Sequence, residues 1–352
     1  MNTEAIDLLF RLARPLSPFY AYLMKLRLRS YETGLLESRK LPCPVISIGN
    51  IVMGGTGKTP HVIAVANFLK TSGKKPAVVS RGYGGKHGAK AIIVHDGHNL
   101  RASPDVAGDE PVMIAEALEN VPVVVHKSRY VAGLKAIREL DADLIILDDG
   151  FQHLSLKRDL DIVLLNAFRP FGTRRVFPGG DLREDVGALD RADIIVLTKS
   201  ETISLAQKER LRHQLHGKWP DKPIFFSENK YTSFNPLDDE TLSLDCVREK
   251  TVVAFCGLAH PDHFFKALKM AGAHIVYQKA YPDHYTYKRS EIHYLCHKAR
   301  QLGAKLIVTT RKDGTKLKRL ATLPTKPPIL QLNMKAVPEA GLFHLLRAKL
   351  GF

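Results

Sequence analysis

Short runs of valine, isoleucine and leucine alternate along the chain with longer segments in which apolar residues recur at helical spacing. The short runs are typical of strands buried on both faces of a parallel sheet, and the longer segments of the helices that cover it. We predict strands over residues 45–48, 77–80, 91–95, 121–125, 144–147, 161–165, 193–197, 223–226, 251–255 and 305–309. We predict helices over residues 59–70, 111–119, 130–140, 204–215, 261–270 and 288–302.

This alternation predicts an α/β fold in which helices cover both faces of a parallel sheet. The length of 352 residues suits about two domains. A loop rich in glycine, proline and arginine over residues 166–181 interrupts the pattern. We therefore expect a first domain over 1–160 and a smaller α/β domain over 161–352, with a C-terminal part that can pack back on the first.

The N-terminal segment, residues 3–30, is predicted to be helical, with an interruption near Pro15 and Pro18. Its leucines and aromatic residues are interleaved with arginines and lysines. Two interpretations are open: an amphipathic helix that lies in a membrane interface, or a helix packed on the first domain. No stretch of the sequence approaches the ~20 apolar residues of a membrane-spanning helix.

Composition narrows the class of protein. The chain is 45% hydrophobic and 25% charged, as soluble globular proteins are. The net charge of +16 favours anionic partners, such as an anionic membrane surface or a phosphorylated substrate. We expect no nucleic-acid partner, because no recognised nucleic-acid-binding module is present, and no obligatory protein partner is evident. The four cysteines have no zinc-ligand spacing and imply no disulfides.

A glycine-rich turn lies between the first predicted strand and the helix at 59–70, which is the context of a P-loop. Such a turn aims backbone N–H groups at phosphate oxygens, and a lysine and a threonine complete the site. In the common form of this loop a glycine stands where this chain has Val52. Some ATPases carry a second lysine where this chain has Met53. We predict that a nucleoside triphosphate binds to Val52, Met53, Gly54, Gly55, Thr56, Gly57, Lys58 and Thr59.

An apolar strand that ends in Asp148 and Asp149 is the expected partner of this loop. Carboxylate oxygens suit a hard ion such as Mg²⁺. With the Thr59 hydroxyl, these two residues are predicted to bind the metal. A helix cap or a turn is the alternative interpretation of the two acidic residues.

A P-loop does not show whether water or another molecule accepts the phosphoryl group, and three further positions are informative on this question. Asp109 precedes a predicted helix and is either a base for a hydroxyl proton or a simple N-cap. His153 follows the Asp148–Asp149 strand, and His284 lies in a Tyr-Pro-Asp-His-Tyr segment. For both histidines an active-site role and a structural role stay open. Loop arginines, among them Arg81 and Arg129, suit an acceptor that already carries phosphate.

These segments together resemble the tetraacyldisaccharide 4'-kinases of lipid A biosynthesis, in order from about residue 10 to about residue 320. The segments that carry the resemblance are 44–50, 54–60, 80–84, 108–110, 147–153, 177–180, 282–285 and 309–313. The resemblance implies a P-loop NTPase-like domain and a smaller α/β domain, an enzyme that uses ATP and Mg²⁺, and a location on the cytoplasmic face of the bacterial inner membrane.

It further implies that the γ-phosphate goes to the 4'-hydroxyl of a lipid-linked disaccharide 1-phosphate. By motif, Asp109 resembles the family's catalytic base and His284 its partner. Glu110 is implied to lie near the metal. Arg81, Arg129 and His153 are implied to bind the substrate.

The residues alone leave a second function open, a P-loop ATPase or GTPase that acts as a switch or in metal insertion. The segment 198–201, Thr-Lys-Ser-Glu, is similar to a guanine-reading loop, with glutamate in place of aspartate. Such a protein hydrolyses the nucleotide instead of transferring its phosphate.

Overall fold

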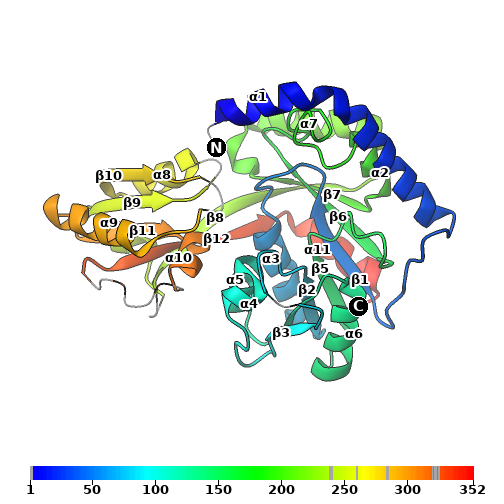
Figure 1. Ribbon diagram of the computed structural model, residues 1–352, viewed down its shortest axis with the longest axis horizontal. Helices are drawn as coiled ribbons and strands as arrows, with labels where there is room; N and C mark the ends of the chain where they lie inside the picture. The colour runs from blue at the N-terminus through cyan, green and yellow to red at the C-terminus, as the bar shows by residue number, and fades with distance from the viewer. Residues whose placement is uncertain are drawn as a thin grey trace. The chain divides into compact units, whose positions relative to one another are not determined.

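The computed structural model of this chain has two compact units. It describes residues 3–86, 88–237, 241–258, 261–282, 285–318, 320, 323 and 326–352. The first unit consists of Met1–Asn229 and Ala336–Phe352, and the second of Lys230–Lys335. Each unit has strands flanked by helices and hydrophobic clusters of its own (Figure 1).

The first unit contains most of the elements. Its strands are β1 (Val45–Asn50), β2 (Pro76–Ser80), β3 (Ile92–His95), β4 (Val123–Val125), β5 (Leu144–Asp148), β6 (Leu160–Asn166), β7 (Ile194–Thr198) and the start of β8 (Ile224–Pro236). Its α-helices are α1 (Thr3–Ala13), α2 (Ser17–Glu32), α3 (Lys58–Thr71), α4 (Pro104–Ala107), α5 (Asp109–Ala117), α6 (Arg129–Leu140), α7 (Leu205–Lys218) and α11 (Ala340–Leu350).

The strands of this unit follow the order β8-β7-β6-β1-β5-β2-β4-β3. All neighbouring pairs are parallel except the edge pair β3–β4, which is antiparallel. The carboxyl ends of β1, β2, β5 and β7 therefore lie along one edge of the sheet. In open parallel sheets this is the edge where ligands bind.

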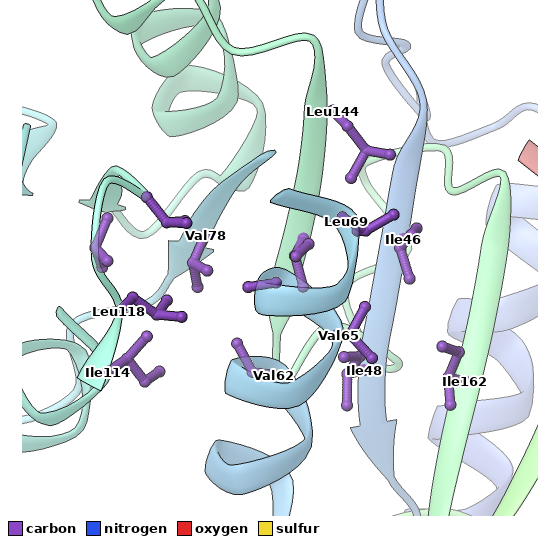
Figure 2. Close-up of a cluster of buried hydrophobic side chains, with 14 of the residues drawn as sticks. Ile46, Ile48, Val62, Val65, Leu69, Val78, Ile114, Leu118, Leu144 and Ile162 are labelled. Carbon is purple, nitrogen blue, oxygen red and sulfur yellow. The ribbon is translucent and has the colours of Figure 1, made fainter. Parts of the chain in front are cut away.

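Alternation along β1 explains why the strand is buried on both faces. Ile46 and Ile48 contribute to one hydrophobic cluster together with Val65 of α3. Val45 contributes to a second cluster that includes Ala132 of α6. Successive side chains of a strand point to opposite faces, so α3 and α6 cover the two faces of this strand. Figure 2 shows the first cluster, in which side chains of α3 point toward the strands.

The second unit is a smaller parallel α/β sheet. Its elements are β9 (Thr251–Cys256), α8 (Pro261–Met270), β10 (His274–Ala280), α9 (Arg289–Gln301), β11 (Leu306–Thr310), α10 (Arg311–Leu317) and most of β12 (Ile329–Pro338). The strand order is β10-β9-β11-β12, and these neighbours are parallel. The unit boundaries fall within β8 and β12, so both strands continue from one unit into the other.

From the sequence we predicted a domain boundary near residue 160, whereas the structure divides the chain after Asn229. The physical reason is strand pairing, because β6 and β7 extend the sheet of β1 in parallel register. The loop over 166–181 therefore lies within the first unit. The C-terminal segment, Ala336–Phe352, also belongs to the first unit. The predictions missed β10 and β12, whose apolar residues are interspersed with polar and charged ones.

The N-terminal segment forms two α-helices joined by a short 3-10 turn over Arg14–Leu16. No residue of α2 is fully buried. Among the described helices, none combines the length and the apolar character that crossing a membrane requires.

We expect Leu346→Ala to destabilise the first unit by about 2–4 kcal/mol, because the substitution leaves a cavity in a packed core. Leu346 is fully buried in the cluster that contains the β1 isoleucines. Urea unfolding measures the effect, and Lys349→Ala on the exposed side of α11 is the matched control. Equal unfolding midpoints for the two variants would contradict the packing of α11 described above.

Candidate active site

The loop between β1 and α3 is held from behind by buried polar side chains. Asn50, at the end of β1, donates from Nδ2 to the Val52 carbonyl (2.6 Å) and to Thr56 Oγ1 (2.7 Å). Thr198, at the end of β7, donates from Oγ1 to the Thr56 carbonyl (2.9 Å). Gly54 and Gly57 have positive φ values of 106° and 84°, which favour glycine. The loop is thus shaped from the sheet side, while Gly54 and Gly55 are exposed.

Backbone contacts hold Val52 and Met53, the two positions at which the loop departs from the commoner sequence. Val52 is buried and forms an isolated antiparallel bridge with Leu182. The backbone N–H of Met53 donates to the Asp181 carbonyl (2.7 Å). We expected a domain junction in the segment over 166–181. In the structure the end of this segment instead packs beside the loop after β1. The backbone at positions 52 and 53 is thus paired with the end of this segment, while the Met53 side chain is exposed.

Cationic side chains lie beside Asp149. Lys58 Nζ is 3.6 Å from Asp149 Oδ1. Arg183 donates from one terminal nitrogen to both carboxylate oxygens of Asp149, at 3.0 and 2.8 Å. Burial opposes ionisation of this carboxyl, but Lys58 and Arg183 outweigh it, so the pKa of Asp149 lies below its ordinary value. Sequence reasoning missed Arg183; its place just after the glycine-rich 177–180 segment was the available signal.

Asp148 has the opposite electrostatic environment. Its side chain is buried and accepts a hydrogen bond from Ser80 Oγ (2.9 Å). Burial, followed by repulsion from Glu110 and Asp149, raises the pKa of Asp148 to about 7. Glu110 and Asp149 thus both disfavour the charged form of Asp148.

These carboxyl groups fit a divalent cation in chemical character. They offer oxygen donors only, as Mg²⁺ prefers, and a cation would relieve the repulsion that raises the pKa of Asp148. Among the described residues, no group of three or more histidine, cysteine, aspartate or glutamate side chains has the spacing of a complete metal site. The hydroxyl of Thr59 and ligands from the nucleotide would have to complete the coordination.

Two glycines bring Asp109 next to the segment that follows β2. A Cβ atom on Gly85 would lie 2.4 Å from the Val106 carbonyl oxygen, and one on Gly108 would lie 2.5 Å from the Tyr83 carbonyl oxygen. The two backbones thus pack at a distance that only glycine allows. Gly108 is the N-cap of α5 without a side-chain cap, and Asp109 is the first helical residue. The N-cap alternative for Asp109 is therefore wrong, since Gly108 holds that position.

Arg129 and His153 pack together beneath this edge of the sheet. Arg129 is 4% exposed, and burial lowers its pKa to about 10. Its Nε has no hydrogen-bond partner among the residues that the structure describes. His153 Nε2 accepts from the Arg129 backbone N–H (3.4 Å) and is 3.1 Å from Ser155 Oγ. Arg81 is exposed, yet close enough to Arg129 to lower the pKa of the latter by repulsion.

Two further predictions concerned His284 and the segment 198–201. His284 lies outside the described residues, as does its neighbour Asp283. In the segment 198–201, Thr198 donates to the Thr56 carbonyl of the loop, whereas Glu201 accepts the backbone N–H of Asn229 on β8 (3.0 Å).

The N-terminal helices contact the site region on one side. Ser17 Oγ donates to the Val176 carbonyl (2.9 Å), and the Arg27 guanidinium donates to the Gln152 carbonyl (3.2 Å). On the outer side, leucines and aromatic residues face solvent, including Leu12 at 71% exposure and Phe19 at 64%. The segment thus packs on the first unit, as one of the two interpretations expected. It also retains the exposed apolar side that the membrane-interface interpretation requires.

Fold and site together define a P-loop NTPase-like α/β protein. The sequence profile of the tetraacyldisaccharide-1-P 4'-kinase family, LpxK, matches residues 9–351. The chain therefore belongs to this kinase family, which confirms the resemblance and sets aside the switch or metal-insertion function.

Relatives and a solved structure agree with this assignment. The tetraacyldisaccharide 4'-kinase of Desulfotalea psychrophila is 42% identical over 90% of this chain and 90% of its own length. That of Syntrophus aciditrophicus is 40% identical over 94% and 90%. The crystal structure of LpxK from Aquifex aeolicus in complex with ATP is 33% identical, with a TM-score of 0.77, and the match covers 97% of this chain and 99% of that one.

We predict an acid-dependent loss of stability that originates at His153. Burial, and then the charges of Arg129 and Arg158, lower the pKa of His153 from 6.5 to about 4. The folded chain therefore binds fewer protons at this site than the unfolded chain, so the free energy of unfolding falls as the pH drops from 6.5 toward 4. Between pH 7 and pH 5 the loss is at most about 2 kcal/mol.

In His153→Gln this contribution is absent, so the stability of the variant should fall less between pH 7 and pH 5 than that of the wild type. Urea unfolding at each pH measures the difference. His213→Gln, on an exposed position of α7, should follow the wild type. Parallel pH profiles for His153→Gln and the wild type would show that the histidine ring titrates normally in the folded state.

Proposed function

We propose that this protein transfers the γ-phosphate of ATP to the 4'-hydroxyl of a lipid-linked tetraacyldisaccharide 1-phosphate. The observation that carries the proposal is the meeting of three segments at one sheet edge. They are the Gly54–Thr59 loop after β1, the Asp148–Asp149 pair at the end of β5, and the Asp109 segment that packs on the loop after β2. A phosphate-binding loop, acidic ligands and a separate carboxylate are the parts of a kinase site.

The nucleotide binds along residues 52–59. The exposed backbone at Gly54 and Gly55 offers N–H groups to phosphate oxygens, and the start of α3 adds a partial positive charge. Lys58 neutralises the β- and γ-phosphates. In the structure this lysine is near Asp149, to which Arg183 is also bound. Arg183 thus holds Asp149 when Lys58 turns to phosphate.

Mg²⁺ is the metal that these oxygen donors suit. Asp148, Asp149, Thr59 and Glu110 would hold it, and it would neutralise charge on the phosphates when bound. Ser80 orients Asp148 through its 2.9 Å hydrogen bond. Burial of Asp148 keeps water from screening its charge.

Asp109 acts as the base. Its carboxylate accepts the proton of the 4'-hydroxyl as the oxygen forms a bond to the γ-phosphorus, and the bond from that phosphorus to the β–γ bridging oxygen breaks to release ADP. The proton remains on Asp109 until it is lost to solvent. His284 is proposed, from the family resemblance, as the residue that supports this base.

Arg81, Arg129 and His153 are proposed to bind the phosphorylated substrate. The unpartnered Nε of Arg129 and the exposed Arg81 supply donors to anionic oxygen. A supporting part is proposed for His153, since its Nε2 accepts a hydrogen bond from the Arg129 backbone.

An anionic membrane surface at the cytoplasmic face of the inner membrane is proposed as the place where the lipid is met. The exposed apolar side of α1 and α2, which includes Leu12 and Phe19, is interleaved with the exposed bases Arg11, Lys25 and Arg29. An apolar side flanked by cations is suited to the headgroup boundary of an anionic bilayer.

We expect Asp109→Asn to abolish transfer while nucleotide binding persists, because the amide cannot take up the hydroxyl proton. The wild type, incubated with γ-labelled ATP and a disaccharide 1-phosphate lipid, should place the label on the 4'-oxygen. The variant should lose at least about a hundredfold in rate and keep its affinity for ADP. Asp105→Asn on α4, four residues earlier and exposed, is the matched control. Label released as inorganic phosphate, whether or not lipid is present, would instead indicate a hydrolase.

We expect the double variant Leu12→Glu with Phe19→Glu to bind weakly to vesicles that contain anionic lipid. Both side chains are exposed, so folding should persist while apolar burial in the bilayer is lost and repulsion is added. Sedimentation with vesicles measures the bound fraction. Met270→Glu, at an apolar position of the second unit that is 79% exposed, is the control. Equal sedimentation of all proteins would leave only the packed-helix interpretation.

A further inference from the structure

His61 is a fully internal histidine that the catalytic proposal does not use. It lies in the first turn of α3, three residues after Lys58, and is 2% exposed. Its ring bridges two partners: Nδ1 is 2.7 Å from the Gly57 carbonyl oxygen, and Nε2 is 2.8 Å from Ser227 Oγ. Ser227, on β8, is itself 1% exposed.

The partners determine the protonation of the ring. The Gly57 carbonyl can only accept, so Nδ1 carries the proton and donates to it. Nε2 then accepts, and the Ser227 hydroxyl donates. Burial lowers the pKa of His61 to about 4, so the ring is neutral at physiological pH. A neutral imidazole can donate at one end and accept at the other.

The side-chain bond to Gly57 supplements a long backbone hydrogen bond to the same carbonyl. The His61 N–H is 3.4 Å from the Gly57 carbonyl, at the long end of hydrogen-bond geometry. The ring also packs against Gly57, where a Cβ atom would lie 3.6 Å from Nδ1. Gly57 has a left-handed conformation and is the N-cap of α3. The histidine ring therefore holds the last glycine of the loop in the orientation from which α3 starts.

The far partner connects the loop to a distant part of the first unit. Residues 61 and 227 are 166 positions apart in the sequence. Next to Ser227, Phe226 exchanges two hydrogen bonds with Glu339: its N–H donates to the Glu339 carboxylate (3.1 Å) and its carbonyl accepts the Glu339 N–H (2.9 Å). β8 is thus fixed where it meets the end of β12, and this gives the ring of His61 a rigid support.

We propose that His61 is a positioning residue for the nucleotide phosphates, acting through Gly57 and held in place by Ser227. The inference rests on the proposed role of the Gly54–Thr59 loop in binding ATP. Asn50 and Thr198 fix the middle of the loop, at Val52 and Thr56. His61 fixes its end, immediately before Lys58. Without it, the backbone N–H groups around Gly57 and the Lys58 stem have more freedom, and that freedom must be lost when phosphate binds.

A series of variants separates the two bonds. His61→Phe keeps the ring volume and removes both. His61→Gln places an amide where Nε2 lies and keeps only the bond to Ser227, whereas His61→Asn places an amide where Nδ1 lies and keeps only the bond to Gly57. Ser227→Ala removes the support and leaves the histidine. His95→Gln, at a half-buried histidine on the edge strand β3, is the control for loss of an imidazole elsewhere in the unit.

The measurements are the dissociation constant of ADP, the KM values for ATP and for the lipid acceptor, and the urea unfolding midpoint. His61→Phe and His61→Gln should weaken ADP binding and raise the KM for ATP about tenfold, the effect of one lost hydrogen bond in a site of this kind. The KM for the lipid should stay at the wild-type value. His61→Asn should restore the nucleotide constants to within about threefold of wild type, and Ser227→Ala should raise them about threefold. His95→Gln should leave them unchanged.

Two results would overturn the inference. One is a lower unfolding midpoint in His61→Phe and His61→Gln with nucleotide constants within about twofold of wild type, which would make the residue purely structural. The other is a His61→Asn variant as impaired as His61→Phe. Should His61→Phe fail to fold, Ser227→Ala decides by the same constants. A wild-type protein that does not bind ADP would instead refute the proposed function.

Discussion

The anchoring of one flexible loop by buried side chains is the constraint on which the site depends. A glycine-rich turn can approach phosphate closely, but glycine also gives it more conformational freedom than any other residue. Here the side of the loop that faces the sheet is bound by Asn50 from β1 and Thr198 from β7. Each of these side chains is buried. Because a parallel sheet brings the ends of β1 and β7 to the same edge, the fold supplies the rigidity that the loop sequence lacks.

At the same edge of the sheet, the adjacent carboxyl groups of Asp148 and Asp149 have different electrostatic environments. Asp149 has a positive φ of 52° and turns toward Lys58 and Arg183. Asp148 stays in the buried register of β5, where Ser80 is its hydrogen-bond donor. The pKa of the first is lowered and that of the second is raised to about 7. The pKa values of these two adjacent aspartates thus differ because the backbone turn at Asp149 places their carboxyl groups among different neighbours.

The surplus of positive charge has a comparable division. Some basic side chains lie beside the candidate site: Arg129 is buried, and the partly buried Arg183 binds Asp149. Others lie on the outer side of the N-terminal helices among exposed leucines. The helices contact the first unit through Ser17 and Arg27 and leave their apolar side uncovered among the described residues. The net charge of +16 does not reveal that its basic side chains have such different surroundings.

Local patterns in the sequence were sufficient to predict the strand–helix alternation, the glycine-rich turn between β1 and α3, and the place of Asp148 and Asp149 at the end of β5, because each depends on neighbouring residues. The family resemblance added Glu110 as a candidate and implied roles for Asp109, Arg81, Arg129 and His153, which the residues themselves had already suggested. The tertiary structure alone decided the boundary after Asn229, since this depends on which strands pair. It also decided that Arg183 binds Asp149, 34 residues away, and that His61 binds Ser227, 166 residues away. Periodicity and spacing report only on residues close in the chain, whereas these contacts arise when distant segments are brought together by the packing of one sheet.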